Sequence, residues 1–115
     1  MKQTIRITED SFFKGSYSGS GDLELHGSFE GSLNVKNLYV KKCGMFIGYV
    51  TAENIIVEGE INADIQTENL YLKSTGIVDG DVMYRNIVID SGGMLKSKMV
   101  QNISKMNNLI KLQNN

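Results

Sequence analysis

Four successive segments of the sequence repeat one pattern: FEGSLNVKNLYVKKCGM (residues 29–45), FIGYVTAENIIVEGE (46–60), INADIQTENLYLKSTGI (61–77) and VDGDVMYRNIVIDSGGM (78–94). A small residue stands third in each segment, an asparagine stands ninth, and an apolar-x-apolar triplet follows the asparagine. The asparagines are Asn37, Asn54, Asn69 and Asn86, so one shorter step lies between two equal, longer ones. A short repeat of this kind is typical of a solenoid, in which each unit stacks on the next.

The first half of each segment has the pattern of a β-strand. From Phe29 to Val35, apolar or small residues alternate with polar ones, and a period of two is typical of a strand. The spacing slips by one residue at Asn37, and a corner in the backbone would absorb this slip. Because asparagine tolerates the left-handed conformation that a corner demands, we expect the four asparagines to form a stack of left-handed corners. The opposite corners are expected at Gly44, Gly59, Gly76 and Gly92–Gly93.

Short strands separated by repeated corners predict an all-β fold, a right-handed parallel β-helix of about five coils. Two helices and a loop do not fit into so short a unit, and the strand positions are rich in β-branched and aromatic residues. A left-handed β-helix would need coils of about 18 residues with a strict hexapeptide period. The shorter, unequal steps between the asparagines break that period.

The solenoid is expected over residues 12–99, between short flexible tails over residues 1–11 and 100–115. Phe13, Gly15 and Tyr17 follow the repeat loosely and predict a degenerate first coil. Ser97 would be the small third residue of a fifth, truncated segment. From Val100 the repeat stops, and the loose helical spacing of the apolar residues predicts a frayed tail or a short amphipathic helix.

The composition points to a single domain without the marks of secretion or of a nucleic-acid partner. The chain has 115 residues, 12 glycines, no proline, one cysteine and a formal net charge of −1. A charge so close to zero does not support binding to nucleic acid through bulk charge, and it does not oppose self-association. A single cysteine cannot form an internal disulfide, so a cytoplasmic location is expected. No apolar run has the length of a signal peptide or of a membrane span, which needs about 20 residues.

The residues that could carry chemistry do not converge in the sequence. His26, the only histidine, lies in a short corner without a visible partner, and Cys43 precedes the corner residue Gly44. The acidic residues are spread over different registers. The glycine-rich run from Gly15 to Gly21 lacks the Lys-Ser/Thr pair and the following helix of a phosphate-binding loop. We therefore predict no catalytic residue, no metal site and no cofactor, and we expect the protein not to be an enzyme.

Outward positions of successive segments line up as two charged columns. The first column holds Lys36, Glu53, Glu68 and Arg85, and the second holds Lys41, Glu58, Lys73 and Asp90. Neighbouring rungs of a parallel sheet lie about 4.8 Å apart. We therefore expect Lys36 to face Glu53 and Glu68 to face Arg85, whereas the second column alternates in sign throughout.

Two stretches of the sequence resemble the bactofilin family. They are GDLELHGSFEGSL (residues 21–33) and GIVDGDVMYRNIVIDSGGMLKS (76–97), and the resemblance covers about Phe13 to Met99. It implies a bacterial cytoskeletal protein that forms filaments without a nucleotide, by end-to-end stacking of right-handed β-helices. Family members attach to the inner face of the membrane and recruit or organise cell-wall enzymes.

The sequence departs from the family pattern in two places. Bactofilins often carry an aromatic residue in the last coil, important for polymer contacts, in a G-x-x-F-x-G pattern. Here Leu95 and Ser97 stand at the aromatic and final glycine positions of that pattern. Many members also carry a short apolar membrane anchor at the N-terminus, whereas this chain begins with the mixed sequence MKQTIRI.

The two ends of a β-helix expose unpaired backbone groups and the cross-section of the apolar core. Such ends template further pairing unless they are capped. We expect Phe12 and Phe13 at the N-terminal end, and Met94, Leu95 and Met99 at the C-terminal end, to be the polymerisation contacts. The alternative is a capped monomer, in which residues 1–10 and the Asn-rich C-terminal tail fold over the ends.

An apolar column is expected to face outward on the solenoid. It consists of Tyr39, Ile56, Tyr71 and Val88, with Tyr49 nearby. Exposed apolar patches mark contact sites, here a lateral filament contact, a membrane surface or a partner protein. The alternative is that stacked β-branched and aromatic residues suit a parallel sheet without any further role.

The sequence and the resemblance together favour a non-enzymatic cytoskeletal scaffold that polymerises with itself. The partners expected from the resemblance are peptidoglycan-modifying enzymes or other cell-envelope proteins, with peripheral contact to the inner face of the cell membrane. Two alternatives stay open: a small β-helix transferase acting at subunit interfaces, and a monomeric β-helix binding module.

Overall fold

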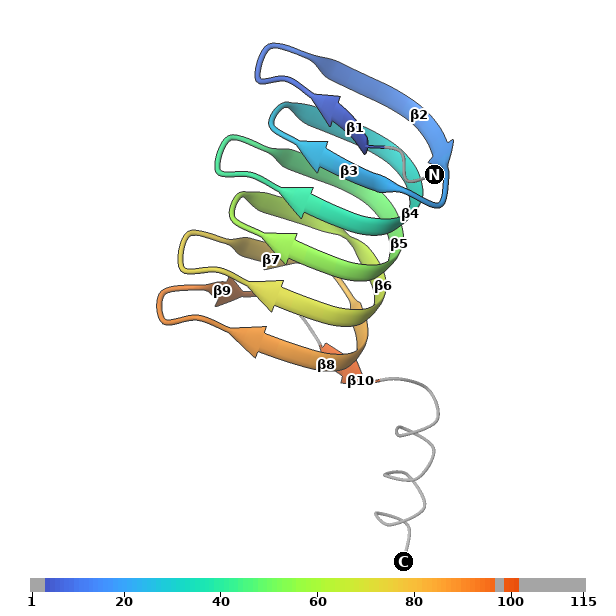
Figure 1. Ribbon diagram of the computed structural model, residues 1–115. Helices are drawn as coiled ribbons and strands as arrows, with labels where there is room; N and C mark the ends of the chain where they lie inside the picture. The colour runs from blue at the N-terminus through green and yellow to red at the C-terminus, as the bar shows by residue number, and fades with distance from the viewer. Residues whose placement is uncertain (1–3, 97–98, 102–115) are drawn as a thin grey trace, which may run out of the picture.

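The chain forms a solenoid in which one parallel sheet winds around a common axis (Figure 1), and apolar side chains fill its interior. The computed structural model describes residues 4–96 and the backbone of residues 99–101. The described residues contain ten strands: β1 (Thr4–Ile7), β2 (Phe12–Ser18), β3 (Asp22–Leu25), β4 (Ser28–Val40), β5 (Met45–Val57), β6 (Glu60–Leu72), β7 (Ile77–Asp79), β8 (Val82–Ile89), β9 (Met94–Leu95) and β10 (Met99–Gln101). Every strand pair among them is parallel.

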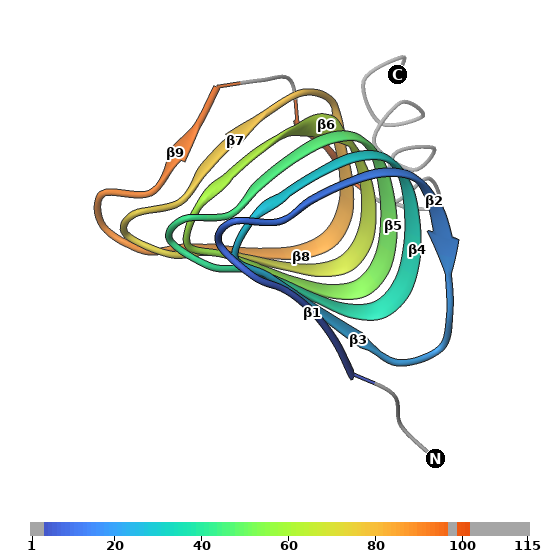
Figure 2. The same ribbon diagram turned by 90° about the horizontal axis from the view of Figure 1, so that it is seen from above.

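The solenoid is right-handed and has about five turns. Viewed from the N-terminal end, the chain runs clockwise as it recedes from the viewer (Figure 2). Each coil is a flattened loop with a rounded bend at one end and a tight turn at the other, and the long strands β4, β5 and β6 pass through the bend. The predicted all-β fold and the right-handed parallel β-helix of about five coils are confirmed.

The strand register stacks equivalent positions of the sequence repeat on one another. β4 and β5 align Gly31 with Gly48 and Asn37 with Asn54, and β6 continues both columns. β2 pairs with β4 in the same register, with Phe13 beside Phe29, so the degenerate first coil is confirmed. Each position of the repeat therefore becomes a column along the solenoid axis.

Inward columns of apolar side chains fill the interior. Phe29, Phe46 and Ile61 stand in one column, and none of them is more than 1% exposed. A second column holds Leu38, Ile55 and Leu70, each 0% exposed. Burial of such side chains contributes about 25 cal/mol per Å² of apolar surface. The core is therefore a continuous rod of columns whose cross-section appears at both ends of the solenoid.

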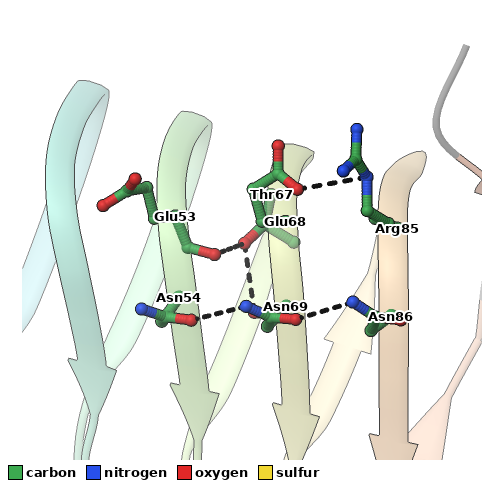
Figure 3. Close-up of polar contacts among 7 residues, drawn as sticks. All are labelled: Glu53, Asn54, Thr67, Glu68, Asn69, Arg85 and Asn86. Carbon is green, nitrogen blue, oxygen red and sulfur yellow. Dashed lines mark hydrogen bonds and ion pairs between the residues drawn. The ribbon is translucent and has the colours of Figure 1, made fainter.

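The asparagine column forms a ladder of side-chain hydrogen bonds (Figure 3). Asn54 Nδ2 donates to Asn37 Oδ1 at 2.7 Å, Asn69 to Asn54 at 2.8 Å and Asn86 to Asn69 at 2.9 Å. At the N-terminal end of the ladder, Asn37 donates to Asp22 Oδ1 at 2.7 Å. No non-glycine residue in the described part of the chain has a positive φ, so the expected left-handed corners are wrong. Asparagine is suited to this column because its amide both donates and accepts a hydrogen bond.

Positive φ angles occur instead in the column of small residues. φ is +136° at Gly31 and +130° at Gly48, a range that favours glycine. A Cβ atom on Gly48 would collide with the carbonyl oxygen of Gly31 in the preceding coil. Ala63 continues the column without a positive φ, and Ser97, the expected fifth member, lies outside the described residues.

Part of the expected N-terminal tail belongs to the solenoid. β1 pairs with β3, which aligns Thr4 with Asp22 and Ile7 with Leu25. The Ile7 side chain is only 8% exposed and joins the core. At the other end, β10 pairs with the start of β8, so the strand pattern continues through residue 101 rather than ending at Val100. The rest of the expected frayed or helical tail over residues 100–115, from residue 102 on, lies outside the described residues.

Replacing Asn54 by alanine should remove one rung of the asparagine ladder. The side-chain carbonyl oxygen of buried Asn37 and the side-chain amide of half-buried Asn69 would then lose their ladder partner. We expect Asn54→Ala to lower the free energy of unfolding by about 2 kcal/mol. The exposed Asn34 is the matched control, and Asn34→Ala should cost less than about 0.5 kcal/mol. Urea titration followed by circular dichroism measures both, and equal losses would show that the ladder does not stabilise the fold.

Candidate interaction surfaces

The N-terminal end of the solenoid exposes apolar side chains and strand edges. β1 pairs only with β3 and β2 only with β4, so their outer edges have no strand partner among the described residues. Phe12 is 64% exposed and Phe13 is 38% exposed. The Phe13 ring stacks on Phe29 with 4.7 Å between centroids, and Phe29 stacks on Phe46 at 5.1 Å. The outer face of Phe13 thus ends an aromatic stack that continues into the core.

The C-terminal end has the same character. β9 pairs only with β7 within the part of the chain that the structure describes. Met94 is 48% exposed, and Leu95 is partly buried and packs against the core. Leu95 lies beside Val78 in register. Met99, the third residue expected here, lies in β10, but its side chain is outside the described ones.

Phe13 and Leu95 are the two ends of one core column. In order, the column consists of Phe13, Phe29, Phe46, Ile61, Val78 and Leu95. The sequence predicts both residues at solenoid ends, and the strand register shows that they share a column. The sequence prediction misses Ile89, which is 44% exposed in the last coil although its equivalent Leu72 is fully buried. The exposure of Ile89 could have been predicted from its position in the last full repeat, because no complete coil follows to cover its side chain.

The predicted outward apolar column is present. Tyr39, Ile56, Tyr71 and Val88 stand in register on consecutive coils. The first three are half-buried, and Val88 is 50% exposed. Tyr49 does not belong to this column, because it precedes the bend at Asn54 and aligns with Ser32 and Asp64 on the other side of the coil.

A charged column runs beside the apolar column. It holds Lys41, Glu58, Lys73 and Asp90, and each of their backbone N–H groups donates to a carbonyl of the preceding coil. Lys73 Nζ lies 3.9 Å from Asp90 Oδ2, and Lys41 Nζ lies 5.9 Å from the centroid of the Tyr39 ring. The apolar and charged columns therefore share one face of the solenoid, which we call the tyrosine face.

The other charged column lies at the bend, next to the asparagine ladder. Arg85 Nε lies 3.3 Å from Glu68 Oε2 (Figure 3), so this predicted ion pair is confirmed. Lys36 also stands opposite Glu53, as expected, because Val35 aligns with Ala52 and Asn37 with Asn54. Within residues 4–96, however, no ion pair joins these two side chains. The buried Thr67 hydroxyl lies 3.1 Å from the carbonyl oxygens of both Glu53 and Asn69 and donates to one of them at a time.

His26, which the sequence left without a visible partner, is paired with a carboxylate. Its Nε2 atom lies 2.6 Å from Glu24 Oε1, and the Arg6 guanidinium lies 3.5 Å from the same oxygen. The hydrogen bond to His26 lowers the pKa of Glu24, and the positive charge of Arg6 adds to this, whereas burial opposes it. Cys43 is exposed at the tip of a turn.

The described residues contain no group of three or more His, Cys, Asp or Glu side chains that could hold a metal ion. They also contain no helix with the length and apolar character that a bilayer crossing requires.

These features define a class of protein, a parallel β-solenoid with a continuous core and two uncapped apolar ends in its described part. The model of a family described as "Bactofilin: Polymer-forming cytoskeletal" matches residues 5–100. The chain therefore belongs to the bactofilin family of polymer-forming cytoskeletal proteins. Comparison with curated proteins and with solved structures gave no match.

The Glu24 cluster should make stability depend on pH in acid. Because the pKa of Glu24 is lowered from 4.5 in the folded state, its carboxylate stabilises the fold above the ordinary pKa. This contribution is lost as the pH falls through the folded-state pKa. We expect Glu24→Gln to be less stable than the wild type at pH 7, with the difference shrinking as the pH falls below 4.5 and vanishing once the folded carboxyl is protonated. Thermal unfolding across this range measures it, with the exposed Glu53→Gln as control, and a difference independent of pH would contradict the assignment.

Proposed function

We propose that the protein is a non-enzymatic cytoskeletal scaffold that assembles end to end into filaments without a nucleotide. The single observation that supports this most strongly is the core column from Phe13 to Leu95. It reaches an exposed position at the N-terminal end and a partly exposed one at the C-terminal end. Unpaired strand edges accompany it at both ends in the described residues.

End-to-end stacking would bury the exposed apolar side chains of an end and pair its open strand edges in the same contact. The apolar side chains Phe12, Phe13, Met94 and Leu95 would leave water, which stabilises the junction by about 25 cal/mol per Å² of apolar surface. The open strand edges would gain backbone hydrogen bonds, as an added strand does on any sheet edge. Neither contribution requires bond hydrolysis, so assembly without a nucleotide follows from the same contacts.

The role of the filament is proposed from family membership. A bactofilin polymer would position cell-wall-modifying proteins in cell shape or morphogenesis, with peptidoglycan-modifying enzymes or other cell-envelope proteins as its partners. We place it in the cytoplasm, with peripheral contact to the inner face of the membrane. The tyrosine face offers a repeated surface for a lateral contact or for a partner, because its columns recur in every subunit of a filament.

Leu95→Glu should block assembly. A carboxylate at the end of the core column would be buried without a partner at each junction. The free-energy cost of moving that charge out of water is larger than the change that weakens an equilibrium constant tenfold. We expect the critical concentration for filament formation to rise at least about tenfold, with filaments shorter or absent. Negative-stain microscopy and sedimentation without nucleotide measure this.

The matched control is Lys96→Glu, which changes charge at the neighbouring exposed position without entering the core column. Circular dichroism of Leu95→Glu establishes that the solenoid itself is folded. Monodisperse wild-type monomers at all salt concentrations would contradict the proposed function, as would normal filaments of the Leu95→Glu protein.

A further inference from the structure

Two large apolar side chains are exposed in the middle of the solenoid, where the open ends do not explain their exposure. Among the described residues, the other exposed large apolar side chains all lie in β2, β8 and β9, the strands of the first and last coils. Ile47 is 40% exposed and Tyr49 is 63% exposed, and both lie in the central strand β5. End-to-end stacking would therefore leave both of them accessible.

The neighbouring coils show that the fold does not need an aromatic residue at position 49. The equivalents of Tyr49 are Ser16 in β2, Ser32 in β4 and Asp64 in β6. The equivalents of Ile47 on the two adjacent coils are likewise polar, a glutamate and an asparagine. Exposed apolar side chains that gather on one face mark contact sites. The pair in β5 therefore points to a contact rather than to packing.

Tyr49 forms one wall of a shallow groove of about 300 Å³, which we call the Tyr49 groove. Asp64 stands beside Tyr49 in register. Asp81 lies one coil further, because the Ile65 N–H donates to the Asp81 carbonyl oxygen at 2.8 Å. No basic residue lines the groove. Its exposed and half-buried side chains are those of Tyr49, Thr51, Asp64, Gln66, Asp81 and Met83.

The two carboxylates of the Tyr49 groove have no cation beside them. Within residues 4–96, ion pairs join other carboxylates to basic side chains on neighbouring coils, as Lys14 joins Glu30 at 3.7 Å. None of these ion pairs reaches Asp64 or Asp81. Neighbouring strands lie about 4.8 Å apart, so two like charges on adjacent coils repel each other. A cation bound in the groove would remove this repulsion.

We infer that the Tyr49 groove binds a basic, arginine-containing segment of a partner protein. The planar guanidinium group of arginine stacks on aromatic rings and forms two parallel hydrogen bonds to a carboxylate. Tyr49 and Asp64, which are adjacent in register, offer both contacts to a single arginine. Exposed Ile47 and half-buried Met83 offer apolar surface to the rest of the segment.

The dimensions of the groove suit an extended segment with two basic residues separated by one other residue. From Tyr49 to Asp81 the groove covers two strand spacings, or about 10 Å. About three residues of an extended chain cover the same distance, and the first and third of them point to one side. The first basic side chain would meet Tyr49 and Asp64, and the second would meet Asp81. This inference deepens the proposed function, because it names the site at which the scaffold would hold a partner.

Three labelled synthetic peptides test the chemistry of the groove. In the first, arginine alternates with leucine, and in the others lysine or glutamate replaces the arginine. Fluorescence anisotropy at low ionic strength measures their binding. We expect the arginine peptide to bind at least about threefold more tightly than the lysine peptide, because lysine lacks the planar bidentate group. The glutamate peptide should not bind, and added salt should weaken the binding of the arginine peptide.

Substitutions in the groove test its position. Tyr49→Ser introduces the residue type that β2 and β4 carry at this position, so the solenoid should stay folded. We expect it to weaken binding of the arginine peptide at least about threefold. Asp64→Lys with Asp81→Lys should weaken it at least about tenfold and allow the glutamate peptide to bind. The matched control is Asp10→Asn, which removes an exposed carboxylate outside the groove and should leave the affinity unchanged.

A stability measurement separates a binding role from a structural one. Asp64→Asn removes one of two like charges, so it should raise the urea midpoint slightly while it weakens binding of the arginine peptide. An Asp64→Asn protein that unfolds more easily and binds the arginine peptide as the wild type does would assign this carboxylate to the fold and overturn the inference. Circular dichroism establishes that each variant is folded.

The readouts keep this inference apart from the proposed function. Binding is measured on the wild type and on the Leu95→Glu protein, which the proposed function expects to stay unpolymerised. Absence of wild-type filaments counts against the proposed function alone, because the groove lies outside the solenoid ends. Equal binding of the arginine and glutamate peptides would overturn the inference on the groove. Tighter binding of neutral dextran than of the arginine peptide would also overturn it, since the groove would then suit a carbohydrate.

Discussion

Every coil of this solenoid takes its backbone hydrogen bonds from the coil before it and the coil after it. This parallel ladder forces each residue onto the equivalent residue of the next coil, at the spacing of neighbouring strands. A sequence with one repeat per coil therefore becomes a set of columns. Columns of apolar residues form the core, and the asparagine column forms a ladder of amide hydrogen bonds. The charged column of the tyrosine face alternates in sign along the solenoid axis.

The same constraint leaves the ends incomplete. Each coil satisfies its neighbour, but the first and last described coils have a neighbour on one side only. Phe13 and Ile89 are exposed for this reason, although their equivalents in the inner coils, Phe29 and Leu72, are buried. The end of a solenoid is thus a section through its core, and polymerisation is a continuation of the contacts that already hold the molecule together.

Much of this architecture can be predicted from the repeat, because a column requires only that equivalent positions be recognised. The bend at Asn37, the turn at Gly44 and the outward column that begins with Tyr39 follow directly. The reason for the asparagine could not be found in this way. A single residue suggests a left-handed corner, whereas four in register form hydrogen bonds that exist only between coils. Likewise Thr4–Ile7 has the apolar-x-apolar triplet of the repeat but lacks its asparagine, and its place in the solenoid follows from the backbone pairing with β3.

Local order along the chain therefore determined the strands, the corners, the spacing of the coils and the column to which each repeated residue belongs. These are periodic properties, and periodicity is visible in one dimension. The tertiary structure alone decided several polar contacts. It placed the Arg6 guanidinium beside Glu24 and the Thr67 hydroxyl beside the Glu53 carbonyl, and it set the positive φ in the small column at Gly31 and Gly48. Those outcomes depend on side-chain distances and carbonyl positions across neighbouring coils, and the order of residues does not specify them.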